Sequence, residues 1–150
     1  MAFLIVKYIH ILAAITAVGI NISYTIWIIR SQREPAHTTF ALKGIKFLDD
    51  RIANPAYGVL LLSGLLMVVL LPIPITTLWI VIALVLYAVM LVVAISQYTP
   101  ALRSQIKLAE AGDTTSAEFN RLATRSRVLG QTLGVIVLVI LAMMVFKPHL

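Results

Sequence analysis

Apolar residues form four long runs along the chain, separated by connections that are charged, polar or rich in proline. Each run is long enough to cross about 30 Å of hydrocarbon at about 1.5 Å of helix rise per residue. The runs extend over Phe3–Ile29, Asn54–Leu71, Leu78–Gln97 and Val128–Phe146. This pattern predicts an all-α integral membrane protein, an antiparallel four-helix transmembrane bundle that forms a single domain over residues 1–150.

The first run resembles a signal peptide in starting near a lysine, but it is too long for that role. No small-residue cleavage site followed by a polar mature region comes after it. We therefore expect the first run to be retained as a transmembrane helix.

The three connections carry different local signals. The segment Pro72 to Thr77 is short and bracketed by prolines, which predicts a tight hairpin. After Pro100, residues 101–111 predict a helical extension of the third span that Gly112 stops. Thr115 to Glu118 then fits a capping box, from which one helix runs unbroken into the last span. In the first connection, residues 40–48 interleave apolar and cationic side chains, which favours an interfacial amphipathic segment over a partner-docking helix.

Charge is distributed unevenly between the connections. The chain is 61% hydrophobic and only 12% charged, so its net charge of +6 is concentrated at few places. Ten of the twelve cations lie in the first and third connections. Because cytoplasmic loops concentrate Lys and Arg, we expect both termini on the non-cytoplasmic side. The cations are Arg30, Arg33, Lys43, Lys46 and Arg51 in the first connection, and Arg103, Lys107, Arg121, Arg125 and Arg127 in the third.

Composition also excludes several classes of function. The clustering of cations in loops explains the basic surplus without nucleic-acid binding, and anionic lipid is the expected contact. The chain has no cysteine, which excludes disulfide chemistry and thiolate metal sites, so any redox chemistry requires a bound cofactor. None of the four spans contains Asp or Glu, which argues against a proton-coupled transporter. We expect Asp50 and Arg51, just before Asn54 and Pro55, to form ion pairs at the membrane surface.

His10 is the histidine that lies within a predicted span, and it carries the candidate chemistry. An ionisable side chain at that depth is costly unless it faces a packed interior, a cavity or a cofactor. At 100° per residue, Ala17 lies within about 20° of His10, Ala14 within about 40°, and Lys7 about 60° away, one turn nearer the surface. Three interpretations stay open: a hydrogen-bonded histidine in a small-residue packing face, a haem ligand, and another metal or proton role.

A haem site requires an axial ligand, a planar cavity and cations for the propionates. In that interpretation His10 ligates haem b, Ala14 and Ala17 line the slot, and Lys7 and Lys147 pair with the propionates. Methionines at comparable depth are possible sixth ligands, although methionine is also common apolar filler. They are Met67, Met143 and Met144.

Other polar residues are interpreted more simply. His37 lies in the first connection, too far from His10 to share a site within one subunit, and His149 is interpreted as an interfacial terminal residue. A further polar set near the cytoplasmic ends of the spans favours interhelical hydrogen bonds over a quinone or substrate pocket. That set consists of Asn21, Tyr24, Ser96, Gln97, Arg127 and Gln131.

Short motifs along the chain give a resemblance. The opening Lys7-Tyr-Ile-His10-Ile-Leu-Ala-Ala resembles the start of small bacterial membrane proteins that include HemJ-type protoporphyrinogen oxidases and CopD-like membrane domains. Closer is the bacterial domain-of-unknown-function family number 2269, which the chain resembles in Asp50-Arg-Ile-Ala-Asn-Pro55-Ala, Leu-Ser63-Gly64-Leu, Trp79 and Val-Phe-Lys147-Pro148.

The resemblance implies a bacterial cytoplasmic-membrane protein. The HemJ-type likeness implies haem b and makes the first-span histidine, His10, the haem-ligand candidate. The second span lacks the additional histidine and cations expected of a HemJ-type oxidase, so porphyrinogen oxidation is not expected. Two function classes follow: a haem-binding redox or haem-handling protein, and a non-enzymatic membrane scaffold or accessory subunit with a structural His10. A homodimer or a redox partner is possible in either class.

Overall fold

The computed structural model describes residues 1–148 and contains four long helical rods, with no strand in that range. Each rod is long and apolar enough to cross a membrane, which confirms the predicted all-α transmembrane bundle. In chain order the rods are α1 (Ala2–Arg33); a 3-10 turn η1 (Pro35–His37) with α2 (Thr38–Leu48), η2 (Asp49–Ala53) and α3 (Asn54–Leu70); α4 (Leu78–Val93) with η3 (Ala94–Tyr98) and α5 (Thr99–Glu110); and α6 (Ala117–Phe146).

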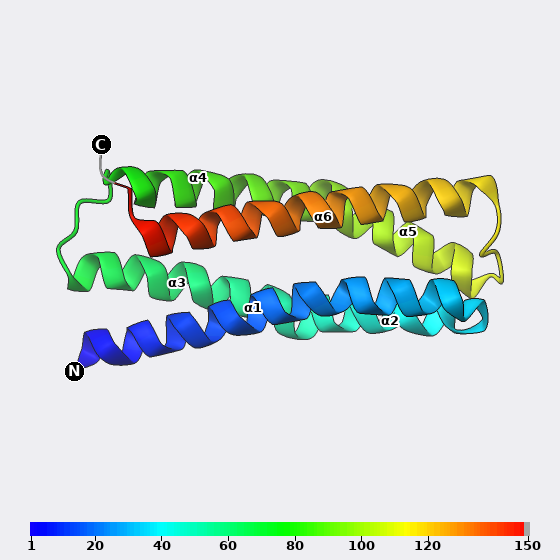
Figure 1. Cartoon of the computed structure of the whole chain (residues 1–150), viewed down its shortest axis with the longest axis horizontal. Coiled ribbons are helices and arrows are strands. Elements are labelled where there is room, and N and C mark those ends of the chain that lie inside the picture. Colours follow the sequence, from blue (N-terminus) through cyan, green and yellow to red (C-terminus); the bar gives the residue numbers. More distant parts are fainter. Residues whose placement is uncertain (149–150) are drawn as a thin grey trace.

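The rods are longer than the predicted spans. The 36-residue rod from Pro35 to Leu70 is about 54 Å long at the usual rise, well over the thickness of the hydrocarbon. Both chain ends and the connection between α3 and α4 lie at one end of the bundle, and the other two connections lie at the opposite end (Figure 1). A large part of the bundle therefore extends past the apolar segments on the side away from the termini.

The two middle rods each contain a π-helical segment, and each segment ends two residues before a proline. Asn54 N–H bonds to the carbonyl of Asp49, and Thr99 N–H bonds to the carbonyl of Ala94, five residues back in both cases. Pro55 and Pro100 follow directly and have no N–H to continue the α-helical ladder. A single wide turn before each proline keeps the rods continuous where an α-helix would break.

The turn between α5 and α6 matches the sequence except for one residue at the helix start. Gly112 adopts φ +83°, a conformation that suits glycine, and ends α5 as predicted. Ser116, not Thr115, caps α6: its hydroxyl accepts a hydrogen bond from Phe119 N–H at 3.1 Å. Glu118 pairs with Arg121 at 2.8 Å instead of closing a capping box. The shift arises because Asp113 accepts the N–H groups of Thr115 and Ser116, which places Thr115 inside the turn.

The rods pack as two helix pairs. In the half of the bundle that holds the chain ends, called here the terminal half (residues 1–20, 56–92 and 129–148), α1 lies along α3 and α4 lies along α6. Within residues 1–148, α3 makes no close backbone approach to α4 or α6. The buried side chains of this half are mostly small, such as Ala13, Ala17 and Ala83. Close backbone approach between α3 and the α4–α6 pair is therefore absent from the described part of this half.

The two pairs are joined in the other half, called here the charged half (residues 21–55 and 93–128). There α2 packs on α5 and α1, and a cluster of large side chains from five elements is buried. Lys43 pairs with Glu110 at 2.6 Å, and the Thr39 hydroxyl donates to the carbonyl of Ala109 at 3.0 Å, both between α2 and α5. The buried cluster consists of Tyr24, Leu42, Ile45, Tyr98, Leu102, Ala109 and Phe119.

The expectation that residues 40–48 form an interfacial segment was wrong. α2 stands in line with α3 and packs its apolar face inside the protein, because Ala41, Leu42 and Ile45 fall on one helix face. Phe40 and Phe47 remain exposed on the opposite side.

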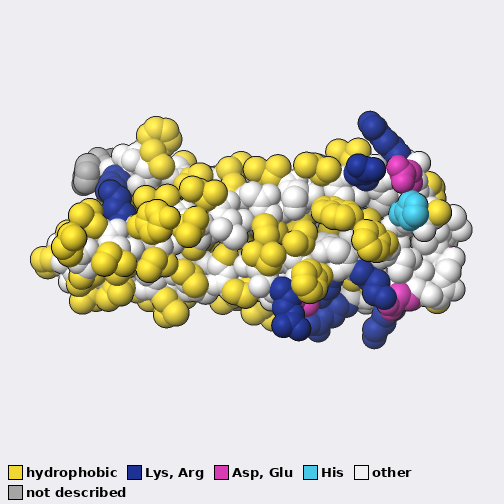
Figure 2. All heavy atoms as spheres, turned by 90° about the horizontal axis from the view of Figure 1, so that it is seen from below, with side chains coloured by type: hydrophobic (Ala, Val, Ile, Leu, Met, Phe, Trp, Pro, Cys, Tyr) yellow, Lys and Arg dark blue, Asp and Glu magenta, His cyan; other side chains and the backbone are white. Residues whose placement is uncertain are grey.

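Surface charge follows the same division. Apolar side chains cover the terminal half, while Lys and Arg gather on the charged half (Figure 2). Asp50 pairs with Lys46, as expected of a residue at the membrane surface, but Arg51 pairs with no carboxylate within residues 1–148. Arg51 is exposed in the π-helical segment η2, and neighbouring residues of a helix point to different faces.

Candidate functional site

His10 is on α1, and its side chain contacts α3 in the terminal half. Its Nδ1 is 2.9 Å from the hydroxyl oxygen of Ser63 on α3. The two residues meet because α1 and α3 run antiparallel: His10 is eight residues from the start of α1 at Ala2, and Ser63 is seven from the end of α3 at Leu70. Ser63 is buried and His10 is half-buried.

The hydrogen bonds of Ser63 determine which nitrogen of His10 carries the proton. The hydroxyl of Ser63 donates to the backbone carbonyl of Val59, one turn earlier on the same helix. Its oxygen is therefore left to accept, so His10 Nδ1 carries the hydrogen and donates it to Ser63. The neutral ring then has an unprotonated Nε2 with a free lone pair, which is the form in which imidazole binds a metal.

Gly64 provides the space that the His10 ring occupies. A Cβ atom at position 64 would lie 3.2 Å from Cε1 of His10 and 3.7 Å from Nδ1. The ring therefore lies directly against the glycine backbone. Ser63 thus accepts a hydrogen bond from the His10 ring, and the backbone of the next residue, Gly64, packs against that ring.

The two lysines predicted to pair with propionates lie at the same end of the bundle but on different helix pairs. Lys7 is exposed on α1. Lys147, directly after α6, has its ammonium 5.5 Å from the centre of the Trp79 ring on α4, a cation–π contact. Lys7 is the cation that shares a helix with His10.

Ala14, Ala17 and Met67 surround His10 on the α1–α3 pair. Ala17 is fully buried, and Ala14 and Met67 are half-buried. The small side chains of the two alanines allow α1 and α3 to approach closely. Because Ala17 is fully buried, a planar ligand reaches it only if the two helices separate.

The remaining predicted ligands lie farther away. Met143 and Met144 are half-buried on α6, in the other helix pair. His37 is exposed in the charged half, and His149 lies outside the described residues. Within residues 1–148 no three His, Cys, Asp or Glu side chains come together to hold a metal ion. A metal held here would therefore depend on His10 as the principal protein ligand.

A second polar cluster lies where the two halves meet. Asn21 donates to the hydroxyl of Tyr57 between α1 and α3, and the hydroxyl of Tyr87 donates to the Tyr57 carbonyl at 3.0 Å, which ties α4 to α3. The hydroxyl of Tyr24 lies 3.4 Å from the carboxylate of Asp49, which is only 9% exposed. These contacts link three rods at the point where the pairs begin to diverge.

Three of the six residues in the predicted polar set make hydrogen bonds between helices. Asn21 and Tyr24 take part in the cluster described above, and Gln97 accepts from Arg125 across to α6. Ser96 instead donates to the carbonyl of Val92 on its own helix, at 2.6 Å.

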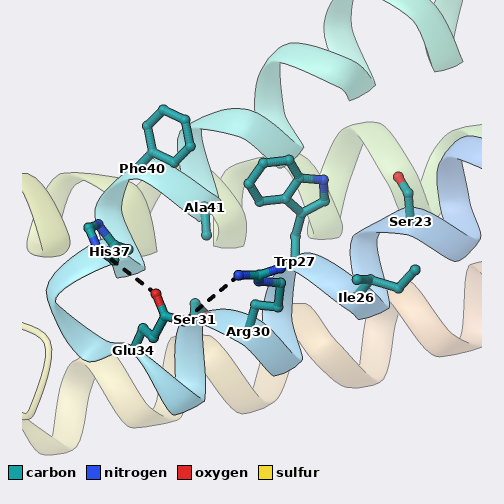
Figure 3. Close-up of a pocket in the computed structure, with 9 residues that line it drawn as sticks. All are labelled: Ser23, Ile26, Trp27, Arg30, Ser31, Glu34, His37, Phe40 and Ala41. Carbon is teal, nitrogen blue, oxygen red and sulfur yellow. Dashed lines mark ion pairs between the residues drawn. The ribbon is translucent and has the colours of Figure 1, made fainter.

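A broad hollow of about 550 Å³ lies between α1 and α2 in the charged half (Figure 3). Trp27 and Phe40 lie on its wall, with ring centres 6.0 Å apart. Glu34 is 3.8 Å from Arg30 and 3.9 Å from His37, so the charged groups of the hollow already pair with one another. The charged side chains that line the hollow therefore already have partners in the protein.

Sequence reasoning identified His10 but missed its partners. Ser63 and Gly64 were noted only as part of a short motif, although their distance from the end of the span equals that of His10. Equal depth on antiparallel helices is the signal that could have paired them. The burial of Asp49 was missed because the apolar run starts five residues later, at Asn54. The helical rod itself continues without a break from Asp49 through Asn54.

The chain was compared with known proteins. A family described as "predicted integral membrane protein (DUF2269)" matches residues 4–148. The chain belongs to this family. No curated protein and no solved structure matches it. The family description agrees with the four apolar rods and assigns no activity.

Proposed function

We propose that this member of family 2269 is a membrane-embedded haem-binding protein with a redox or haem-handling role, in which His10 is the axial ligand. The observation that carries the proposal is the Ser63 hydroxyl, which accepts the Nδ1 hydrogen of His10 and leaves Nε2 free. Histidines that bind metals are oriented in this way by a group that accepts their other N–H.

Two further features support His10 as a ligand. Its ring is fixed against Gly64, so little conformational freedom is lost when Nε2 binds. The hydrogen bond to Ser63 uses Nδ1 of His10, which leaves Nε2 as the nitrogen for a ligand. Bound haem would supply one-electron chemistry, while the protein would supply the ligand, the apolar surroundings and, through Lys7, a cation for a propionate.

The test is absorbance of the protein purified from haem-replete cells. The wild type should show a Soret band and visible bands that change on reduction. His10→Ala should lose the Soret band, and Ser63→Ala should weaken haem binding by about 10- to 100-fold, as expected when the partner of a ligating histidine is removed. Lys7→Ala should weaken retention by only a few-fold, because an exposed ion pair contributes little.

His37→Ala is the matched control, since His37 is an exposed histidine of the charged half. It should keep the full Soret band. Circular dichroism should show unchanged helix content in every variant. Wild-type protein that is colourless and does not bind added haemin would contradict the proposal, as would equal loss of haem in the His10 and His37 variants.

The alternative is a non-enzymatic membrane scaffold or accessory subunit, in which His10 only ties α1 to α3. The hydrogen bond to Ser63 favours this alternative, because it gives the half-buried imidazole of His10 a partner without any bound ligand. The two functions differ in the haem-free protein. A structural role predicts that His10→Ala and Ser63→Ala lower the thermal stability of colourless protein by similar amounts, with no effect of added haemin on either the wild type or the variants.

We also propose that both termini lie on the non-cytoplasmic side of a bacterial cytoplasmic membrane, because the cations gather at the opposite end of the bundle. A reporter that is active only outside the cytoplasm should be active when fused to the C-terminus. Activity of a cytoplasm-specific reporter at that position would contradict this orientation.

A further inference from the structure

A second, smaller pocket of about 280 Å³ lies in the charged half, between α1, α2, α5 and the first turns of α6. At about 30 Å³ per water molecule it holds roughly nine waters, far too few for a tetrapyrrole. It is at the lower end of the volumes of small-molecule sites. The pocket is thus distinct from the His10 site in both place and size.

Two buried polar side chains line this pocket without partners in the protein. Ser126 is 7% exposed, and its hydroxyl oxygen has almost no accessible surface and makes no hydrogen bond within residues 1–148. Gln105 is 6% exposed, and its amide likewise has no partner in that range but is not sealed. Buried polar groups are nearly always hydrogen-bonded, so two unpaired ones at one pocket indicate a polar occupant.

The charge of the lining indicates the sign of that occupant. Arg127 lines the pocket next to Ser126, is exposed, and pairs with no carboxylate in the described chain. No Asp or Glu lines the pocket among residues 1–148. Apolar side chains also line the pocket, among them Leu42, Leu102 and Phe119.

We propose that this pocket binds a small amphipathic anion, with an oxygen-rich head group held by Arg127, Ser126 and Gln105 and a short apolar tail against the apolar side chains of the lining. The guanidinium offers charge-assisted hydrogen bonds to a carboxylate or phosphate. The Gln105 amide donates further hydrogen bonds to the same oxygens, and the Ser126 hydroxyl does so after rotation about its Cα–Cβ bond. Such a head group belongs either to a soluble organic anion or to an anionic lipid of the adjacent leaflet.

The test uses the full chain in nanodiscs of phosphatidylcholine, with hexanoate and hexyl phosphate as probes and calorimetry as the measurement. Wild type should bind at least one probe saturably. Arg127→Gln should weaken binding by about 10-fold or more, the loss expected for a hydrogen bond to a charged group. Arg121→Gln, on the same helix but paired with Glu118 and outside the pocket, should bind within about two-fold of wild type.

Ser126→Ala separates ligand binding from folding. Because the hydroxyl has no partner in the free protein, its removal should leave thermal stability unchanged or slightly raised while it weakens the probe several-fold. A loss of stability in Ser126→Ala without a loss of binding would overturn the proposal. It would also be overturned by no saturable binding of either probe, by equal affinities of the Arg127 and Arg121 variants, or by 1-hexanol binding as tightly as hexanoate.

Nanodiscs that contain phosphatidylglycerol distinguish the two sources of the anion. Competition between this lipid and the soluble probe supports the anion site and assigns it to a lipid head group. Undiminished probe binding supports the site and assigns it to a soluble anion.

Discussion

The charged half and the terminal half are formed by the same four rods but are held together differently. In the charged half, large side chains such as Ile45 and Leu102 are almost fully buried, and α2 is tied to α5 by an ion pair and a hydrogen bond. In the terminal half the buried side chains are mostly small, and α3 makes no close backbone approach to α4 or α6 within the described chain. The charged half therefore fixes the two helix pairs, and the terminal half presents His10 on one of them.

The polar side chains of the two halves also differ in the partners that they bind. In the charged half, eight of the sixteen Asp, Glu, Lys and Arg side chains form ion pairs with one another, as Lys43 does with Glu110. In the terminal half the main polar contact is between His10 and Ser63, and it leaves one nitrogen of the histidine available. In the terminal half the two helix pairs are loosely joined, and one histidine is oriented as a ligand. Such a region can accommodate a bound group more easily than a tightly packed core can.

The largest expected effect comes from the core of the charged half. Ile45 is 1% exposed, so Ile45→Ala should lower the free energy of unfolding by about 2–5 kcal/mol through lost burial and the cavity left behind. The matched variant Ile22→Ala removes the same atoms from a side chain that is 62% exposed and should cost less than about 1 kcal/mol. Thermal unfolding in detergent measures both. Similar losses in the two variants would mean that Ile45 is not part of a tightly packed core in the charged half.

A smaller effect is expected at the one closely fitted point of the terminal half. A Cβ at Gly64 lies 3.2 Å from the His10 ring, which Ser63 holds in place, whereas a Cβ at Gly58 on the same helix meets no atom within 4 Å. Gly58→Ala should therefore gain up to about 1 kcal/mol from helix propensity, and Gly64→Ala should lose that gain or become destabilising. Equal stabilisation by both substitutions would show that His10 moves freely and is not seated on the glycine.

The ion pair between α2 and α5 should contribute little on its own. Lys43 and Glu110 are 58% and 45% exposed at the side chain, so a double-mutant cycle with Lys43→Gln and Glu110→Gln should give a coupling of about 0.2–1 kcal/mol. Added salt should reduce the coupling further. A coupling well above this range would move the main link between the helix pairs from the apolar cluster to the ion pair.

The smallest effect concerns the turn before α6. Hydrogen bonds from the side chain and then the backbone of Ser116, and a weaker one from Thr115 N–H, lower the pKa of Asp113 below its ordinary value. The stabilisation that Asp113 gives the turn is therefore fully present above its ordinary pKa, near 4, and is lost as the pH falls through the lower pKa of the folded protein. Carboxyl-carbon NMR should show the low pKa in the wild type and a return toward the ordinary value in Ser116→Ala. An unchanged pKa in that variant would reject the assigned cause.

The fold could be predicted from the sequence where composition alone decides it. Four apolar runs determined the number of rods, and Gly112 ended α5, because glycine and apolar length act locally. The cap of α6 was displaced by one residue because Asp113 competes for the first N–H groups, which no pattern of hydroxyls and acids reveals.

The packing of the rods could not be predicted in the terminal half. Apolar residues cover every face of α1 there, so periodicity indicates that the helix is in a membrane but not which face meets a neighbour. His10 was identified by its polarity, yet its pairing with Ser63 depends on the depth of two antiparallel helices. Asp49 was placed outside the second span because hydropathy ends at the polar residues, while the π-helical turn lets the helix continue.

The most direct test of the division into halves is a pulsed-EPR distance measurement in nanodiscs, which the absence of cysteine makes simple. One labelled pair, Lys43→Cys with Glu110→Cys, spans the two helix pairs in the charged half. The other, Val69→Cys with Val145→Cys, spans α3 and α6 in the terminal half at two exposed positions. We expect a narrow distance distribution for the first pair and a broad one for the second, since no packed interface holds α3 against α6. Equally narrow distributions would contradict the account.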